Sequence, residues 1–396
     1  MSTAVSFKSV DILFGRKQHE ALALLDAGGN RGEILQKADV VLGCADCSLD
    51  VEAGEISVLM GLSGSGKSTL LRGVNGLNKI TRGSITVFDG RGMVDVATGN
   101  KATIRQLRQN NVAMVFQQFG LLPWRTVAEN VGFGLEISGV EDASRKARVD
   151  KQLKLVGLEQ WANKYAHELS GGMQQRVGLA RAFATEAPIL LMDEPFSALD
   201  PLIRNKLQDE LLQLQKSLKK TIIFVTHDLE EALKLGTTIS IMEGGRIVQS
   251  GKPEDIVLRP ATPYVKEFVA NVNPLSVLTA WNVMRGLHEL ERESPGWIWL
   301  DRNKTARVKL GTDNRVTKAE RNGVNVEMYP CTQAEEVGAG ETKAIFWATP
   351  STPLKAVMVA MHNSGAAPVA LFNESQALVG AIGMRDILRA VLKKDA

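Results

Sequence analysis

The sequence contains no apolar run that approaches the roughly 18 residues a membrane-spanning helix needs. Its first residues, Met1-Ser2-Thr3-Ala4, lack the basic region and apolar block of a secretory signal. It has no block of Lys or Arg, and a formal net charge of +3 gives little support to nucleic-acid binding. We therefore expect a cytosolic protein without a nucleic-acid partner, which meets a membrane only through another protein.

Cysteine and histidine are scarce. Cys44 and Cys47 form a C-x-x-C, but the segment 40–51 has the pattern of an extended strand, on which positions three apart face opposite sides. That geometry disfavours a disulfide or a metal pair and favours simple packing. The histidines have no metal-binding spacing, which leaves Mg²⁺ with a nucleotide as the expected metal. They are His19, His167, His227, His288 and His362.

The chain's 396 residues are enough for two or three domains with their own cores, and 44% hydrophobic and 23% charged residues are typical of globular proteins. Apolar runs of the buried-strand type alternate with helical patterns over residues 1–272, which predicts an α/β domain. Helical character over about 17–41 and about 118–182 interrupts the alternation. We interpret these ranges as a helical insert and a helical subdomain. The pattern breaks near Pro260, Pro263 and Pro274, which predicts a domain boundary at about residue 272.

The most informative stretch runs from Gly61 to Ser68, G-L-S-G-S-G-K-S, and fits G-x-x-x-x-G-K-[ST] at every fixed position. It follows the apolar run 56–60 and precedes a helical pattern. Glycines allow successive N–H groups to turn toward a polyphosphate, and the helix N-terminus adds partial positive charge. We expect Lys67 to reach the β- and γ-phosphates and Ser68 to ligate Mg²⁺. The predicted nucleotide cradle comprises Gly61, Ser63, Gly64, Ser65, Gly66, Lys67, Ser68 and Thr69.

Two further apolar runs of the parallel-sheet type end in polar residues. Residues 189–192 stop at Asp193 and Glu194, and residues 222–225 stop at Thr226 and His227. Because ligands of doubly wound sheets bind at the carboxyl ends of strands, these side chains should converge on the phosphate loop. We expect Asp193 to hold Mg²⁺ and Glu194, facing the other way, to orient or deprotonate the attacking water.

A second small-residue turn enters a helix at Leu169 to Arg176, L-S-G-G-M-Q-Q-R. Residues 170–172 can expose backbone N–H groups to an anion. One domain does not need two phosphate cradles for one nucleotide, whereas two copies related by a C₂ axis would use both. The sequence therefore predicts a homodimer in which each nucleotide lies between the phosphate loop of one chain and this turn of the other.

Taken together, the motifs occur in the order and spacing of an ABC-transporter ATPase subunit, which residues 40–250 resemble. Gln117 after the apolar run 114–116 and the segment Ser197 to Asp200 complete the set. The resemblance implies a P-loop NTPase fold of ABC type, with a mixed sheet core and the helical subdomain. It further implies binding of ATP and Mg²⁺, and ATP hydrolysis that drives a membrane partner.

The same resemblance implies roles for single residues. Gln117 would sense Mg²⁺ and the membrane partner, Asp200 would communicate across the dimer, and His227 would reach the γ-phosphate. Phe14 lies where the family places an adenine-stacking aromatic residue, usually Tyr, and keeps the π-face while losing a hydroxyl. The residues implied to meet the opposite nucleotide are Ser170, Gly171, Gly172 and Gln174.

The insert and the tail resemble those of ATP-binding subunits from importers of glycine betaine, proline betaine and choline. The whole chain is most similar to the choline-type members. This resemblance implies a peripheral protein at the cytoplasmic face of the inner membrane. Its implied partners are integral membrane permease subunits and a periplasmic or lipid-anchored substrate-binding protein.

The tail, residues 273–396, resembles a CBS-like α+β regulatory domain. Its second half, 350–396, has the order helix, strand, strand, helix and ends in the run Gly383 to Leu388. Residues 275–345 show no clear first copy of this motif. A ligand-sensing domain and a purely structural or dimerising tail therefore both remain open.

Two other functions share the ATPase motifs. A soluble ABC ATPase that acts on nucleic acid would carry a long coiled-coil insertion between Lys67 and Asp193, or two ATPase domains, and this chain has neither. An importer subunit for another solute, such as an amino acid or a polyamine, remains open, because the transported molecule contacts other subunits.

Overall fold

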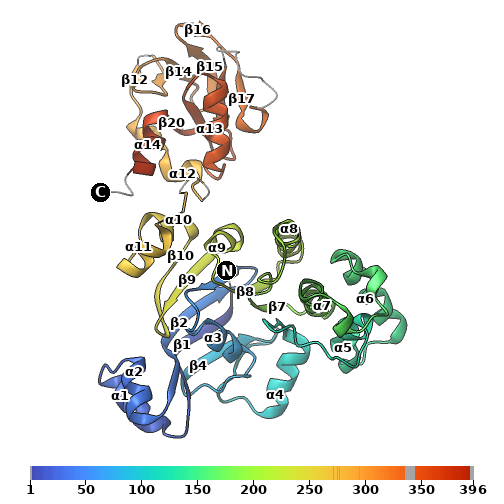
Figure 1. Ribbon diagram of the computed structural model, residues 1–396. Coiled ribbons are helices and arrows are strands. Elements are labelled where there is room, and N and C mark those ends of the chain that lie inside the picture. The colour runs from blue at the N-terminus through green and yellow to red at the C-terminus, as the bar shows by residue number, and fades with distance from the viewer. Residues whose placement is uncertain are drawn as a thin grey trace. The chain divides into compact units, whose positions relative to one another are not determined.

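The computed structural model describes residues 2–270, 272–273, 275, 277–293, 295–334 and 344–392. The chain divides into two compact units, one of Met1–Ile256 with Ala261–Val265 and the other of Val257–Pro260 with Lys266–Ala396. Figure 1 follows the chain from blue at the N-terminus to red at the C-terminus. The division at about residue 272 stays a prediction, and residues 393–396 of the predicted tail domain lie outside the described residues.

A six-stranded mixed sheet forms the centre of the first unit, in the order β10-β9-β3-β8-β7-β6. All neighbours run parallel except β10, which pairs with β9 as an antiparallel hairpin. Every residue of β3, β7 and β8 is buried, which explains why these strands are continuous apolar runs in the sequence. The strands are β3 (Ile56–Met60), β6 (Val112–Val115), β7 (Ile189–Asp193), β8 (Thr221–Thr226), β9 (Thr238–Glu243) and β10 (Arg246–Gly251).

An antiparallel sheet of order β2-β1-β4-β5 lies against helix α3 (Lys67–Val74), and one apolar cluster joins this sheet, α3 and the six-stranded sheet. Ile12, Leu70 and Ile223 represent the three layers in that cluster. Such a shared core fixes the phosphate loop between the two sheets. The strands are β1 (Thr3–Phe14), β2 (Val41–Glu52), β4 (Arg82–Phe88) and β5 (Met93–Asp95).

The prediction that Cys44 and Cys47 face opposite sides of their strand is wrong. Both side chains are buried in the same apolar cluster, and they hydrogen-bond to each other. The physical reason lies between them, where Asp46 adopts a left-handed φ of 48° and interrupts the alternation of the strand. Both thiols are free. The hydrogen bond with Cys47, followed by burial, raises the pKa of the Cys44 thiol, so it remains protonated at neutral pH.

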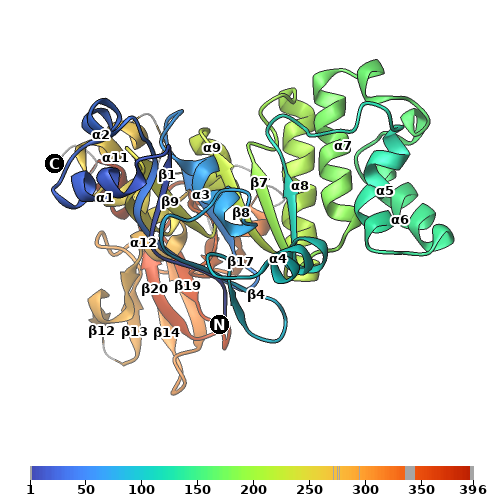
Figure 2. The same cartoon turned by 90° about the horizontal axis from the view of Figure 1, so that it is seen from below.

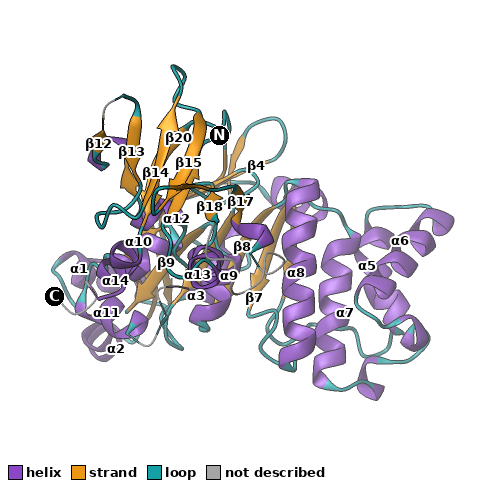
Figure 3. Cartoon of the chain, turned by 90° about the horizontal axis from the view of Figure 1, so that it is seen from above, coloured by secondary structure: helices purple, strands orange, loops and turns teal. Residues whose placement is uncertain are grey.

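Two groups of helices extend the first unit. Helices α1 (Gln18–Asp26) and α2 (Arg31–Ala38) form within the predicted insert and bury Ala21, Leu25 and Ile34 against the start of β2. Figures 2 and 3 show helices α5 to α7 grouped together, and α7 also contacts strand β6. These helices are α5 (Val127–Ile137), α6 (Asp142–Leu155) and α7 (Gly171–Ala184). The remaining helices are α4 (Lys101–Gln106), α8 (Pro201–Leu218), α9 (Leu229–Leu235), α10 (Pro253–Leu258) and α11 (Pro263–Val269).

The second unit contains two sheets. One has the order β11-β20-β19-β18-β17 and packs against helix α13, and the other is an antiparallel sheet of order β12-β13-β14-β15-β16. The helix, strand, strand, helix order predicted after residue 350 is present as α13 (Leu354–Asn363), β19 (Val369–Phe372), β20 (Leu378–Ile382) and α14 (Met384–Leu392). Before it lie α12 (Ala280–Val283), β11 (Arg285–Gly286), β12 (Arg292–Glu293), β13 (Trp297–Trp299), β14 (Ala306–Leu310), β15 (Val316–Arg321), β16 (Val324–Asn325), β17 (Met328–Pro330) and β18 (Ile345–Ala348).

Candidate nucleotide-binding site

The phosphate loop connects the buried strand β3 to helix α3. Gly61, Gly64 and Gly66 adopt φ values of 151°, 79° and 104°, a region that only glycine enters readily. A Cβ on Gly61 would lie 2.2 Å from the Met242 carbonyl oxygen, so the loop also needs glycine for its close approach to the end of strand β9. Lys67, Ser68 and Thr69 then form the first turn of α3, where the N–H groups of the helix have no carbonyl partners.

Lys67 lies inside the loop. Its Nζ donates to the carbonyl oxygens of Gly61 and Leu62 at 2.8 and 2.9 Å and to Ser65 Oγ at 3.4 Å. The side chain is almost fully buried, and burial lowers the pKa of its ammonium below the usual 10.5, against the opposing effect of Glu194 and Asp193. The ammonium therefore occupies a desolvated site in which backbone dipoles are its main partners.

Asp193 ends strand β7 and is completely buried. One carboxylate oxygen accepts a hydrogen bond from Ser68 Oγ at 2.6 Å, and the other accepts one from Arg72 Nη2 at 2.9 Å. The structure therefore brings together the hydroxyl and carboxylate that the sequence predicts as metal ligands. Arg72 was not predicted, because only the packing of α3 on β7 places it beside this carboxylate.

Glu194 points away from Asp193 toward two other predicted residues. Its carboxylate accepts from Gln117 Nε2 at 3.3 Å and lies 3.4 Å from His227 Nδ1. The two carboxylates diverge, as predicted, but not because the strand continues through Glu194. Strand β7 ends at Asp193, and Glu194 adopts a left-handed φ of 47°. Gln117, Glu194 and His227 thus gather where β6, β7 and β8 end.

The predicted second turn begins helix α7. Ser170 caps that helix by accepting from the Met173 N–H at 3.4 Å, and Gln174 donates to the Leu169 carbonyl at 3.1 Å. Ser170 and Gly171 are exposed, and a Cβ on Gly171 would meet nothing within 4 Å. Within the described part of the chain, no hydrogen bond or ion pair joins this turn to the phosphate loop of the same chain.

Helix α7 also contributes a buried residue that the sequence did not single out. Gln175 donates to the Glu194 carbonyl at 3.2 Å, and its side-chain oxygen accepts from the Ala198 N–H at 3.1 Å. Gln175 thereby holds Glu194 and Ala198, the two ends of the segment 194–198 that follows β7. Two residues further on, Asp200 caps helix α8 by accepting from the Ile203 N–H at 3.1 Å.

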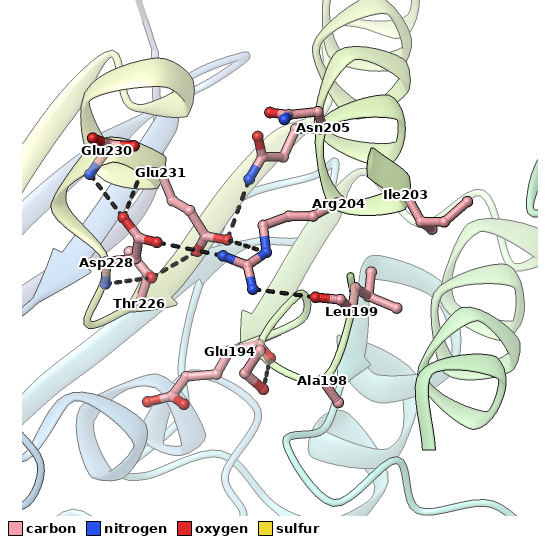
Figure 4. Close-up of polar contacts among 12 residues, drawn as sticks. Glu194, Ala198, Leu199, Ile203, Arg204, Asn205, Thr226, Asp228, Glu230 and Glu231 are labelled. Atoms are coloured by element: carbon pink, nitrogen blue, oxygen red, sulfur yellow. Dashed lines mark hydrogen bonds and ion pairs between the residues drawn. The ribbon is translucent and has the colours of Figure 1, made fainter. Parts of the chain in front are cut away.

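A polar network connects the segment 197–200 to the end of β8 (Figure 4). Arg204 donates to the Leu199 carbonyl at 3.2 Å and lies 3.6 Å from Asp228. The carboxylate of Glu231 accepts from the Thr226 hydroxyl at 2.7 Å. Burial raises the pKa of Glu231, while its hydrogen bonds and Arg204 oppose the shift. Residues from α8, β8 and α9 meet here, so no local sequence pattern could have revealed the network.

Phe14, the predicted aromatic partner of the nucleotide base, ends strand β1 and is 42% exposed. Its ring lies beside Gly43, where an added Cβ would come within 2.9 Å of Phe14 Cε2. A Cβ at Gly43 would also lie 2.7 Å from Thr69 Cγ2, which places Phe14 near the start of α3. Ser63 and Gly64 are exposed at the outer part of the loop.

Comparisons with known proteins decide the family. The family model described as ABC transporter matches residues 44–197, and the one described as CBS domain matches residues 335–393. The chain is 39% identical over 401 residues to the glycine betaine/proline betaine transport system ATP-binding protein ProV of Escherichia coli, covering 99% of this chain and 98% of that protein. The chain belongs to the quaternary-amine family of ABC-transporter ATP-binding subunits.

Other members of this ABC family are similar over the ATPase region. The glycine betaine/carnitine transport ATP-binding protein GbuA of Listeria monocytogenes is 49% identical over 272 residues, covering 69% of this chain and 68% of that protein. The choline transport ATP-binding protein OpuBA of Bacillus subtilis is 42% identical over 270 residues, covering 68% of each chain. A CBS domain follows the ABC ATPase domain, as the sequence predicts.

A solved ABC structure shares the fold. A dimeric ATP-binding cassette in a post-hydrolysis state with ADP and Pi has a TM-score of 0.55 and is 30% identical, covering 63% of this chain and 98% of that one. The chain is thus an ABC ATPase that binds and hydrolyses ATP, of a class whose cassettes form dimers. In the part of the chain that the structure describes, no helix has the length and apolar character needed to span a membrane.

Proposed function

We propose that this chain energises the import of a quaternary amine, such as glycine betaine or choline, as one of two identical ATPase subunits. The relatives named for these solutes support the proposal. In it, the chain lies at the cytoplasmic face of the membrane, bound to integral permease subunits that receive the solute from a periplasmic or lipid-anchored binding protein. The exposed Trp124, in the segment before α5, is a candidate contact with the permease.

The ATP phosphates are proposed to lie in the loop Gly61–Ser68, with Phe14 stacked on the adenine. The observation that carries this proposal is the convergence of Lys67, Asp193 and Glu194 at the carboxyl ends of the strands. When ATP arrives, Lys67 exchanges the carbonyls of Gly61 and Leu62 for phosphate oxygens. This exchange is favourable because a buried ammonium gains more from anionic oxygens than from carbonyl dipoles.

The residues present fit Mg²⁺. Ser68 Oγ and the Asp193 carboxylate are hard oxygen donors 2.6 Å apart, with the amide of Gln117 as a third group near the same strand ends. Among the described residues no group of three or more His, Cys, Asp or Glu side chains could hold a metal. Proteins commonly hold Mg²⁺ through one or two carboxylates together with substrate phosphates. Bound Mg²⁺ would neutralise part of the negative charge on the triphosphate.

Glu194 is proposed as the group that orients or deprotonates the attacking water, because its carboxylate faces Gln117 and His227 rather than the Ser68–Asp193 pair. His227 would contact the γ-phosphate from the end of β8. The exposed turn Ser170–Gly172, with Gln174, would contact the nucleotide held by the second copy, and Asp200 would connect the two copies. Closure on two ATP molecules would then move the permease.

An uptake experiment tests this function. Cells that lack this chain are supplied with the wild-type protein or with Glu194→Gln, and uptake of labelled choline and of labelled glycine betaine is measured. We expect the wild type to restore uptake of at least one of them. We expect Glu194→Gln to bind ATP without restoring uptake, because general acid–base catalysis supplies about 10²- to 10⁴-fold of a rate. Restored uptake of an amino acid or a polyamine, with neither quaternary amine imported, would favour the alternative solute class.

A further inference from the structure

One side chain of the helical insert reaches the phosphate loop. Arg31 is the first residue of α2, and its guanidinium donates to three backbone carbonyls. Nε donates to Leu42 at 2.7 Å and Nη2 to Gly43 at 2.9 Å, both in β2, while Nη1 donates to Gly64 in the phosphate loop. Arg31 thus connects the insert, the first residues of β2 and the loop through a single rigid group.

Gly64 lies at an open, exposed point of the loop. Gly61 lies tightly against the Met242 carbonyl, and a Cβ on Gly66 would come within 2.5 Å of the Gly43 carbonyl. The Ser65 carbonyl accepts from the Gly245 N–H at 3.1 Å. A Cβ on Gly64, in contrast, would meet nothing within 4 Å, although its φ of 79° is one of the conformations that depend on glycine. Arg31 therefore holds an open point of the loop.

Arg31 and Lys67 bind different carbonyl oxygens of the loop. Lys67 contacts the carbonyls of Gly61 and Leu62 from inside the loop, and these contacts end when its ammonium turns to phosphate. Arg31 binds a different carbonyl and reaches it from the side of β2. Its contact with Gly64 does not compete with phosphate binding, so it can hold the loop in both states.

The charge of Arg31 is not matched by a nearby carboxylate. All of its hydrogen bonds in the described part of the structure are to carbonyl oxygens, and no ion pair involves it there. The guanidinium carries a positive charge. It therefore adds positive charge beside the loop, where it favours a bound polyphosphate at long range as well as fixing the backbone.

We propose that Arg31 is a positioning residue for ATP, through which the helical insert sets the affinity of the phosphate loop. The inference rests on the proposed role of Gly61–Ser68 as the ATP cradle. Since Arg31 touches neither Glu194 nor the metal ligands, it acts on binding and not on the chemical step. Arg31→Ala should therefore raise the KM and the dissociation constant for ATP and leave kcat within about twofold.

The test measures steady-state ATPase kinetics and equilibrium ATP binding for the full chain and its variants. We expect Arg31→Ala to weaken ATP binding about tenfold, which corresponds to about 1.4 kcal/mol and to the usual size of a charge-assisted hydrogen bond. Arg31→Lys should give an intermediate value, because lysine keeps the charge but cannot bridge three carbonyls. Lys37→Ala is the matched control, because it removes an exposed positive charge from the same helix.

The alternatives give different results. An unchanged KM in Arg31→Ala would overturn the proposal, and so would a fall in kcat with KM unaffected. If Arg31→Ala and Lys37→Ala weaken ATP binding equally, the effect of Arg31 is one of general charge, and the proposal is overturned as well. If Arg31→Ala does not fold, Arg31→Lys alone decides, since wild-type ATP affinity in that variant contradicts the need for the bridge. ATP binding that survives Lys67→Ala would instead contradict the cradle itself.

Discussion

At the scale of single residues, Lys67 is a buried cation in the loop where we propose that the ATP phosphates bind. The ammonium is buried in the loop, where carbonyl dipoles replace only part of the hydration it has lost. Burial therefore lowers the pKa of the ammonium, and the carboxylates of Glu194 and Asp193 offset this only in part. A bound triphosphate would reverse the effect, because anionic oxygens favour the charged form.

This shift predicts a pH dependence of ATP binding. The nucleotide-free protein releases the Lys67 proton at a pH below 10.5, whereas the complex retains it. ATP affinity should consequently fall as the pH rises through the lowered pKa toward 10.5, by at most about tenfold per pH unit. The measurement is the dissociation constant of ATP between pH 8 and pH 10. In Lys67→Arg the side chain stays charged, and the slope should disappear.

The same pKa shift makes the stability of the folded chain rise with pH, whereas it makes ATP affinity fall. The unfolded chain holds the Lys67 proton up to its ordinary pKa, while the folded chain releases it earlier. The destabilising contribution of the buried ammonium is therefore fully present below the lowered pKa and is relieved as the pH rises from there toward 10.5.

An ATP affinity that stays constant over this range in the wild type would contradict the assignment of Lys67 to the phosphates.

At the scale of elements, the helical insert is bound to the ATPase core by packing and by charge. Ala21, Leu25 and Ile34 bury apolar surface against β1 and β2. Arg82, the first residue of β4, also lies between two carboxylates, with Nε 2.5 Å from Asp11 and Nη2 2.9 Å from Asp26. Asp11 is almost fully buried, whereas Asp26 is exposed at the end of α1.

These two carboxylates predict unequal effects on stability. Arg82→Ala leaves the buried Asp11 carboxylate with the Asp46 N–H as its one partner among the described residues. The variant should lower the free energy of unfolding by about 2 kcal/mol, a value kept modest because Arg82 is 43% exposed. Asp26→Asn, the control, removes an exposed partner and should shift the unfolding midpoint little. Urea unfolding followed by tryptophan fluorescence measures both. Equal destabilisation by the two variants would show that Asp26 anchors the insert as strongly as the buried pair.

At the scale of the whole molecule, the ATPase unit presents an exposed small-residue turn at the start of α7. Ser170 and Gly171 are exposed at the N-terminus of α7, and no hydrogen bond joins them to the phosphate loop in the described part of the chain. Gln175 and Arg204 each hydrogen-bond to the backbone of the neighbouring segment 197–200. A preformed, exposed turn of this kind supports the proposal that a second copy supplies its nucleotide.

Ser170→Arg should separate binding from turnover. The variant places a long cation at the proposed dimer interface and leaves the phosphate loop intact, so a single chain should bind ATP with wild-type affinity. ATP hydrolysis should fall at least about 100-fold, because closure would be blocked. In the Glu194→Gln background, size-exclusion chromatography with ATP should show a dimer that Ser170→Arg abolishes. Normal turnover by Ser170→Arg would rule out the shared site.

The sequence alone determined the fold class and the family. Buried strands such as 189–193 and 221–226 are continuous apolar runs, and the phosphate loop needs glycine at defined positions, so both leave local signals in the sequence. The order of the motifs then identified an ABC ATPase, which the comparisons confirm. The choice of solute was inferred from resemblance only, because no described contact of this chain concerns it.

Only the tertiary structure decided how the side chains meet. Cys44 and Cys47 share one face because Asp46 has a left-handed backbone, and Glu194 diverges from Asp193 for the same kind of reason. Arg31 lies 33 residues before the carbonyl it binds at Gly64. Such contacts depend on the packing of elements that are distant in sequence and on single backbone angles. Periodicity and motif spacing report neither, because both describe local repeats of the chain.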